Sequence, residues 1–343
     1  MQGTVRIPAA KNSVLPLIAA SLLCTKPVRL RGVPRLSDVE ACLALVRSTG
    51  EKAGWQGSDV CVSGTPFCST LPGQTAEQMR ASILFCAPLL ARLGRAETSL
   101  PGGCKIGARP VDLHLAGLAK MGAQEHPAGP GRLLLTAPSG LHGAEITLSF
   151  PSVGATETLL LAAACAKGQT VLRGAAREPE IGDLAAFLNR CGGCVEGAGT
   201  STIRIEGRRT LGGCVFSPLP DRIFASTLAC ACAAAGGRVE LAGCPASLYA
   251  PVLEILAQMG CAVDTDGDTV RLARFGRLYG AGRVFTGVYP GLATDAAPLL
   301  AAAMLCAGGE SSIEEVIFER RFACAEGFLR LGGRVFVAGR VLH

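Results

Sequence analysis

Apolar and polar positions recur along the chain in blocks of similar design. Each block has a helix-length run rich in Ala and Leu, a glycine, a short β-branched run, and an amphipathic stretch that ends in glycine. The first block contains the apolar run 15–23, the run 28–30 and the amphipathic stretch 38–48, which Gly50 closes. Apolar spacings of three and four predict helices in the long runs, and the short runs predict strands. Each block therefore reads as a βαβαββ-like unit.

The blocks start near Lys11, Arg80, Ser152, Asp221 and Thr294, about 70 residues apart. Alternating stretches at 202–206 and 269–272 predict hairpin strands between them. Such a unit cannot bury its apolar face alone and must pack against its siblings. The sequence therefore predicts an α/β fold of five copies. Because five is uneven, either the two domains are unequal or a closing unit is missing.

Length and charge narrow the class of protein. The 343 residues suit two domains that each bury a core. The formal charge of +6 is dispersed and no basic run carries interleaved aromatics, so nucleic acid is not expected as a partner, whereas anionic small molecules fit. Pro16 and the lack of a small-residue cleavage site argue against a signal peptide. No apolar run reaches the roughly 18 residues that cross a bilayer. We expect a soluble, cytoplasmic protein without membrane insertion.

The 16 cysteines are scattered and mostly apolar in context, which indicates a reducing compartment and buried thiols. Cys191 and Cys194 form a CxxC pair, but no second pair or histidine pair stands nearby to complete a zinc site. The pair follows a predicted helix over 183–190, where its two glycines suit an ordinary helix end. We expect no metal and no cofactor.

The strongest candidate for chemistry is the stretch 99–114, which contains Cys104. Two glycines precede the thiol and allow a tight backbone, while Lys105 and Arg109 lie within five residues and favour anions. The alternative is a cationic turn that happens to hold one cysteine.

With these residues in view, the chain resembles the enolpyruvyl transferases. Several motifs carry the resemblance in family order across nearly the whole chain: Ala10-Lys-Asn12, Met79-Arg-Ala-Ser82, Leu100-Pro-Gly-Gly-Cys104, Ile106-Gly-Ala-Arg-Pro-Val-Asp-Leu-His114, Pro151-Ser-Val-Gly-Ala-Thr156, Ala175-Ala-Arg-Glu-Pro-Glu-Ile181, Leu219-Pro-Asp-Arg-Ile223, Tyr289-Pro-Gly291, Thr294-Asp295 and Phe318-Glu-Arg-Arg-Phe322. The family's shikimate-pathway branch lacks the cysteine loop and matches less well.

The resemblance implies a two-domain inside-out α/β barrel built from βαβαββ units. Residues 11–219 would form one domain of three units that carries the cysteine loop. Residues 1–10 would join 220–343 in a second domain of two units, whose third unit is absent from the sequence.

The implied reaction moves the enolpyruvyl group of phosphoenolpyruvate to the 3′-hydroxyl of UDP-N-acetylglucosamine and releases phosphate, in peptidoglycan precursor synthesis. Cys104 matches the proton donor, which also forms a covalent adduct in the family. Asp295 matches the group that accepts the hydroxyl proton; its alternative is a helix N-cap. Lys11, Arg80 and Arg109 match cations around phosphate and carboxylate, although alone each would be read as a solvated surface charge.

The resemblance also implies substrate contacts. Asn12 would pair with the sugar through its amide, and Ile317 matches an apolar neighbour of the uridine. The contacts to uridine diphosphate match Arg109, Pro110, Val111, Asp112, Leu113, Ser152, Val153 and Gly154. The segment Arg177-Glu-Pro-Glu180 reads as a turn at the family's cleft, with an ion-paired loop as its alternative.

The absent unit would carry further arginines for phosphoenolpyruvate, so three interpretations compete. The first is a transferase. The second is a degenerate homologue that binds UDP-N-acetylglucosamine without turnover, as a sensor or partner protein. The third is an incomplete, poorly stable product with exposed apolar surface.

Overall fold

The strands of the computed structural model, which describes residues 1–102, 106–107 and 110–343, form five sheets, one for each predicted copy. Four of these sheets have four strands and share one pattern, in which the pair at one edge of the sheet is parallel and the other two pairs are antiparallel. A parallel pair needs a long crossover, and helices supply it in the directly connected copies. The predicted mixed α/β fold is therefore confirmed.

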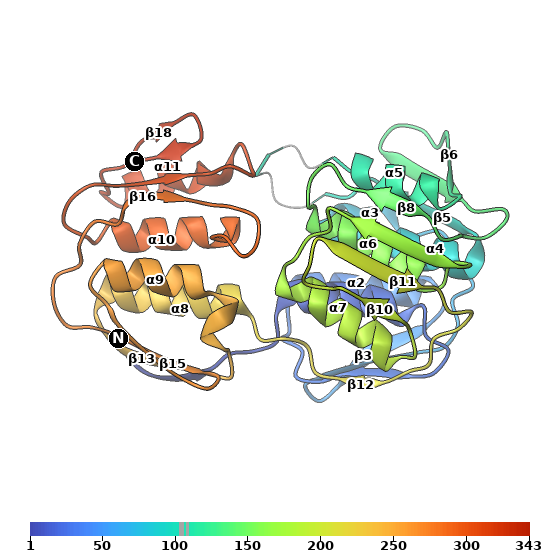
Figure 1. Cartoon of the computed structure of the whole chain (residues 1–343), viewed down its shortest axis with the longest axis horizontal. Helices are drawn as coiled ribbons and strands as arrows, with labels where there is room; N and C mark the ends of the chain where they lie inside the picture. Colours follow the sequence, from blue (N-terminus) through green and yellow to red (C-terminus); the bar gives the residue numbers. More distant parts are fainter. Residues whose placement is uncertain (103–105, 108–109) are drawn as a thin grey trace. The chain divides into compact units, whose positions relative to one another are not determined.

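The chain clusters into two units, each described here by itself (Figure 1). Unit 2 holds residues 11–102 and 110–219 with three copies, and unit 1 holds residues 1–10, 106–107 and 220–343 with two copies. Both ends of the chain lie in unit 1.

The first copy of unit 2 has the sheet order β12-β2-β4-β3. Its elements are α1 (Lys11–Ser21), β2 (Val28–Leu30), α2 (Ser37–Ser48), β3 (Lys52–Gln56), β4 (Asp59–Ser63) and β12 (Val215–Phe216). The second copy has the order β5-β7-β6 and consists of α3 (Gly73–Glu77), the 3-10 helix η1 (Arg80–Phe85), α4 (Cys86–Leu93), β5 (Arg95–Ser99), α5 (Asp112–Lys120), β6 (Gln124–His126) and β7 (Arg132–Thr136).

The third copy of unit 2 has the order β10-β11-β9-β8. It contains β8 (Glu145–Thr147), α6 (Val153–Ala163), β9 (Gln169–Arg173), α7 (Pro179–Arg190), β10 (Val195–Glu196) and β11 (Thr202–Glu206). The predicted hairpin strand at 202–206 is thus β11. The helix predicted over 183–190 begins four residues earlier, because Pro179 occupies its first turn, where a missing N–H costs nothing.

Unit 1 repeats the design twice, with the orders β1-β13-β15-β14 and β16-β17-β19-β18. The first copy comprises β1 (Gln2–Arg6), α8 (Arg222–Ala235), β13 (Gly237–Ala242), η2 (Ala246–Leu248), α9 (Ala250–Gln258), β14 (Ala262–Asp266) and β15 (Thr269–Arg274). The second comprises β16 (Gly282–Phe285), η3 (Thr294–Ala296), α10 (Ala297–Met304), β17 (Ser311–Glu314), η4 (Arg321–Cys324), α11 (Ala325–Arg330), β18 (Val337–Ala338) and β19 (Val341–Leu342).

Two strands are exchanged along the chain. The N-terminal strand β1 pairs in parallel with β13 of unit 1, more than 230 residues later, while β12 pairs in parallel with β2 of unit 2. Pro8 follows β1 and Asp221 follows β12. The Asp221 N–H donates to the Pro8 carbonyl at 2.8 Å, so the two segments lie side by side there. The copy that opens each unit is therefore completed by a strand from a distant part of the sequence.

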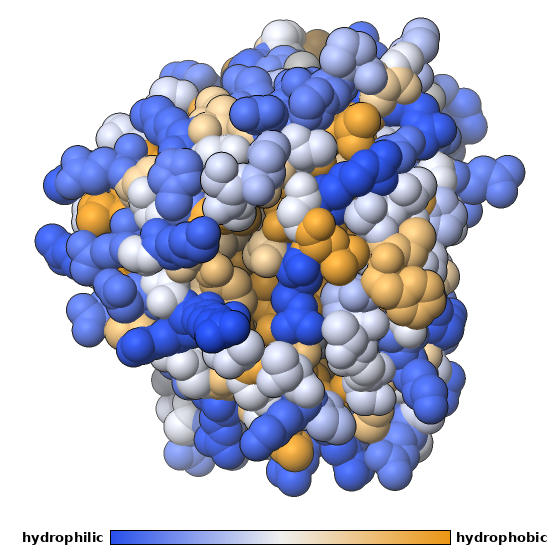
Figure 2. Space-filling model, turned by 90° about the vertical axis from the view of Figure 1, so that its right-hand side faces the viewer, coloured by the Kyte–Doolittle hydropathy of each residue, from blue (hydrophilic) through white to orange (hydrophobic). Residues whose placement is uncertain are grey.

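Buried apolar residues form the core of each unit. On the face of unit 2 seen in Figure 2, polar and charged side chains predominate, with apolar groups between them. Among the described residues, no helix is both long and apolar enough to cross a membrane.

Candidate active site

Predicted site residues of unit 2 stand at the starts of helices. Lys11 and Asn12 begin α1, and both are exposed. The Lys11 Nζ atom lies 3.1 Å from Oδ2 of Asp38 in α2, and both side chains are partly accessible to solvent. The ammonium is thus held near the helix start and still reaches solvent.

Arg80 begins η1 and reaches toward the start of α5. Its Nη2 donates to the carbonyl of Pro110 at 2.8 Å. Pro110 and Val111 lead into α5, whose first residues Asp112 and Leu113 are also predicted contacts of the nucleotide. The structure therefore brings Arg80 and the segment 110–113 together.

The segment Ser152–Gly154 begins α6, and Ser152 is its N-cap, with Oγ accepting from the Ala155 N–H at 3.3 Å. This helix start lies against α5 through His114. A Cβ atom on Gly154 would stand only 3.1 Å from Cε1 of His114, so the close approach favours glycine there. The two predicted nucleotide-binding segments are therefore neighbours.

His114 is buried, and its Nδ1 lies 2.8 Å from Oγ1 of Thr158 in α6. Burial lowers the pKa of His114 to about 4, and the charge of Arg80 acts in the same direction. At neutral pH the imidazole is neutral and joins α5 to α6 as a hydrogen-bonding group.

The predicted proton donor Cys104 and the predicted cation Arg109 lie outside the described residues. Gly102, just before them, is described and shows why a glycine stands there. A Cβ atom at this position would come within 1.7 Å of the Glu77 carbonyl oxygen. Only a residue without a side chain fits between this backbone and α3.

The segment Arg177-Glu-Pro-Glu180 is not a free turn, because Pro179 and Glu180 belong to the first turn of α7. Glu180 is buried, as is Glu157 of α6. Burial raises the pKa of Glu157 well above its usual value, and the charges of Glu180 and Glu178 raise it further. Acidic groups thus gather beside the start of α7.

In unit 1, Asp295 lies within the 3-10 turn η3, and no side-chain capping bond is made at the start of η3 or α10. The alternative reading of Asp295 as an N-cap is therefore wrong. Its carboxylate instead pairs with Arg321, whose Nη2 donates to Oδ1 at 2.5 Å while Nε donates to the Thr294 carbonyl at 2.8 Å. Arg321 lies 26 residues from Asp295 in the sequence, so no local sequence pattern predicted this ion pair.

Ile317 follows β17 and is half-buried. Its backbone N–H donates to Oε1 of Glu315 at 2.7 Å. Glu315 also accepts from the Thr294 hydroxyl at 2.7 Å. The structure therefore connects Ile317 with the turn of Asp295, and Glu315 is a residue that sequence reasoning missed.

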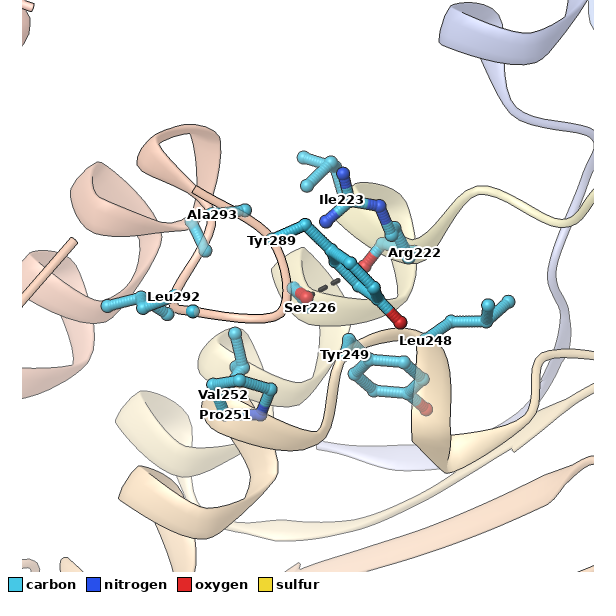
Figure 3. Close-up of a pocket in the computed structure, with 12 residues that line it drawn as sticks. Arg222, Ile223, Ser226, Leu248, Tyr249, Pro251, Val252, Tyr289, Leu292 and Ala293 are labelled. Atoms are coloured by element: carbon cyan, nitrogen blue, oxygen red, sulfur yellow. Dashed lines mark hydrogen bonds between the residues drawn. The ribbon is translucent and has the colours of Figure 1, made fainter. Parts of the chain in front are cut away.

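A shallow hollow lies next to η3 in the same unit (Figure 3). Tyr289 and Leu292 come from the loop before η3, Val252 from α9, and Arg222 from the start of α8. The Arg222 guanidinium lies 5.9 Å from the centre of the Tyr289 ring, within the range of a cation–π contact. Two motifs quoted for the family resemblance, at 219–223 and 289–291, thus meet in one place.

The fold is that of an enolpyruvyl transferase. The crystal structure of the enolpyruvyl transferase NikO from Streptomyces tendae superposes with a TM-score of 0.86 at 25% sequence identity, over 100% of this chain and 81% of that one. EPSP synthase from Acinetobacter baumannii, at 20% identity and a TM-score of 0.71, shares the fold over 99% of this chain and 81% of its own.

The chain belongs to the EPSP synthase (3-phosphoshikimate 1-carboxyvinyltransferase) family, whose profile matches residues 1–342. Among curated relatives, the UDP-N-acetylglucosamine 1-carboxyvinyltransferase of Finegoldia magna is 44% identical over 99% of this chain. The enzyme of the same name from Hyphomonas neptunium is 43% identical over 99%. In both comparisons the chain covers 81% of the relative. The predicted family is confirmed.

Proposed function

We propose that this protein transfers the enolpyruvyl group of phosphoenolpyruvate to the 3′-hydroxyl of UDP-N-acetylglucosamine, as a UDP-N-acetylglucosamine 1-carboxyvinyltransferase of the cytoplasm that serves peptidoglycan synthesis. The observation that carries the proposal is the 44% identity over 99% of the chain to a relative with this name. The adjacent helix starts at 110–113 and 152–154, described above, support a site for the nucleotide.

The proposed reaction has an addition and an elimination. The sugar hydroxyl oxygen bonds to C2 of phosphoenolpyruvate and gives its proton to Asp295, while Cys104 donates a proton to the methylene carbon C3. A proton then leaves C3, the double bond returns, and the C2–phosphate bond breaks to release inorganic phosphate. The products are the enolpyruvyl ether of the nucleotide sugar and phosphate, so atoms and charges balance.

The remaining proposed roles are binding and charge neutralisation. Lys11, Arg80 and Arg109 bind the phosphate and carboxylate groups, since ammonium and guanidinium groups bind such anions strongly. Asn12 binds the sugar. The proposed contacts with the nucleotide are Pro110, Val111, Asp112, Leu113, Ser152, Val153, Gly154 and Ile317. Residues 11–219 are proposed as one domain, and residues 1–10 with 220–343 as the other.

The proposal is tested by incubating the chain with both substrates and identifying the product by mass spectrometry. We expect a nucleotide sugar heavier by one enolpyruvyl group, formed only when phosphoenolpyruvate is present. Calorimetric binding of UDP-N-acetylglucosamine to folded protein without any such product would contradict transfer and favour the degenerate homologue.

Cys104→Ser separates chemistry from binding. Because a positioned general acid typically contributes about 10²–10⁴-fold, we expect turnover to fall by that factor while the Kd for UDP-N-acetylglucosamine changes less than about 2-fold. Cys306→Ser is the matched control, since Cys306 is an exposed thiol that follows α10. Full turnover in Cys104→Ser would remove Cys104 from the proton-donor role.

A further inference from the structure

Glu315 is a carboxylate with no solvent exposure at the end of β17. Burying a charge is costly unless hydrogen bonds replace its water. Here Oε2 accepts from the Thr294 hydroxyl at 2.7 Å, and Oε1 accepts from the backbone N–H groups of Ile317 at 2.7 Å and Phe318 at 3.0 Å. Three donors thus converge on one buried side chain.

The three donors belong to two different segments of unit 1. Thr294 adjoins Asp295 in η3, whereas Ile317 and Phe318 follow β17. Arg321 reinforces the connection, because it binds both the Thr294 carbonyl and the Asp295 carboxylate. Each oxygen of Glu315 therefore fixes one of the two segments relative to the other.

Packing alone does not require a carboxylate at this position. A buried apolar side chain of similar volume often costs nothing in stability where a buried ion is replaced. Here, however, an apolar side chain would leave the N–H groups of Ile317 and Phe318 without the acceptor that turns the chain after β17. The carboxylate determines where the segments stand.

We infer that Glu315 is a positioning residue, which holds the Asp295 carboxylate and the Ile317 contact at a fixed separation while touching neither substrate. The inference rests on the proposed function, in which Asp295 accepts the sugar hydroxyl proton and Ile317 neighbours the uridine. Correct separation is needed because misplacement of a reacting group by about 1 Å costs on the order of 10²-fold in rate.

Three variants separate the two arms of this arrangement. Thr294→Val removes only the hydroxyl arm, so kcat falls about 10-fold through Asp295 while KM for UDP-N-acetylglucosamine stays within about 2-fold. Glu315→Ala removes both arms, so kcat falls about 10²-fold and KM rises about 5-fold.

Glu315→Gln is the conservative rescue. Its amide oxygen still accepts from Ile317 and Phe318, and its NH₂ group donates to the Thr294 hydroxyl, which is both donor and acceptor. We therefore expect kcat and KM within about 3-fold of the unmodified chain. Glu326→Ala, which removes an exposed carboxylate from α11, is the matched control and leaves both constants unchanged.

A merely structural role would give a different pattern, in which activity falls in proportion to the fraction of unfolded protein and the two constants do not separate. That pattern overturns the inference, as does unaltered turnover in Glu315→Ala or a Glu315→Gln variant as impaired as Glu315→Ala.

Absence of turnover in the unmodified chain contradicts the proposed function and moves the test of Glu315 to hydrogen exchange. We then expect faster amide exchange at 294–296 and 317–318 in Glu315→Ala, and near-normal exchange in Glu315→Gln. Unchanged exchange in Glu315→Ala overturns the inference even then.

Discussion

In unit 2, every residue of α1 from Ser13 to Ser21 is buried, and so is every residue of α6 from Ala155 to Ala163. In unit 1 the corresponding helices α8 and α10 bury residues on one side, while Leu228 and Leu299 on other sides are only partly buried. Unit 2 packs three copies of the repeat, whereas unit 1 packs two. We infer that the third copy of the repeat in unit 2 covers the sides of α1 and α6 that would otherwise remain accessible to solvent.

This difference in burial between the two units does not come from the apolar character of the helices. Residues 297–304 of α10 are all apolar, as the residues of a helix enclosed on every side are expected to be. The amount of apolar surface left accessible is therefore set by the number of neighbouring copies and not by the helix itself. We expect unit 1 to unfold before unit 2.

The largest expected difference concerns core leucines. Leu17→Ala in α1 removes a side chain with no solvent exposure and should lower the free energy of unfolding of unit 2 by about 2–5 kcal/mol. Leu299→Ala in α10 should cost unit 1 only about 1 kcal/mol, because its side chain is already partly solvated. Urea unfolding followed by circular dichroism reports both units.

Fluorescence distinguishes the units, because the one tryptophan of the chain, Trp55, lies in β3 of unit 2. We expect the fluorescence transition to come after the first circular dichroism transition, and only Leu17→Ala to move it strongly. A single coincident transition, shifted equally by both substitutions, would show that the units do not differ in stability.

A buried carboxyl in unit 2 gives a smaller, pH-dependent effect. Burial raises the pKa of Glu51 to about 7 from 4.5, and Arg92 opposes the shift. Because the folded-state pKa is the higher one, the stabilisation is complete below about pH 4.5 and is lost as the pH rises through about 7. Glu51→Gln mimics the neutral form, so at pH 8 its unfolding free energy should exceed that of the unmodified chain by about 1–2 kcal/mol.

The comparison of Glu51 and Glu51→Gln at pH 4.5 is the internal control, since both side chains are then neutral in the folded state and the difference should nearly vanish. The measurement is the Trp55 fluorescence transition in urea at the two pH values. An equal difference at both values would assign the effect to packing.

The smallest effect on stability is expected at the salt bridge between Lys11 and Asp38. Both side chains are substantially exposed, so Asp38→Asn should change the unfolding free energy of unit 2 by less than about 0.5 kcal/mol. Lys11→Met should be equally mild for stability but should lower turnover at least about 10-fold, because the proposed role of Lys11 is to bind anions. Equal turnover losses in the two variants would mean that Lys11 acts through the salt bridge.

The repeat, the hairpin strand at 202–206 and the α/β class were predictable because they rest on local patterns of apolar residues. The helix start within the segment 177–180 was not predictable from local patterns. Pro179 is compatible with either a turn or a helix start, and the packing of the third copy decides between the two. Local patterns do not predict the pairings of β1 with β13 and of β12 with β2 either, because each joins residues more than 180 positions apart. The family resemblance, and no local pattern, implied that residues 1–10 belong with residues 220–343.

In the candidate site, too, features carried by local motifs were predicted, whereas contacts between distant residues were not. Motifs predicted the segments at 110–113 and 152–154 as nucleotide contacts, and these segments lie at two neighbouring helix starts. The pairing of Asp295 with Arg321 and the convergence on Glu315 were not found, because both join residues more than 20 positions apart. Only the short part of that convergence is local, since Glu315 accepts from the N–H groups of Ile317 and Phe318, two and three residues further along.

The most direct test of the central claim is the release of phosphate from phosphoenolpyruvate by the unmodified chain, measured with and without UDP-N-acetylglucosamine. The account predicts steady release that requires the nucleotide sugar and is suppressed by Cys104→Ser. Folded protein that binds the nucleotide sugar and releases no phosphate would contradict it.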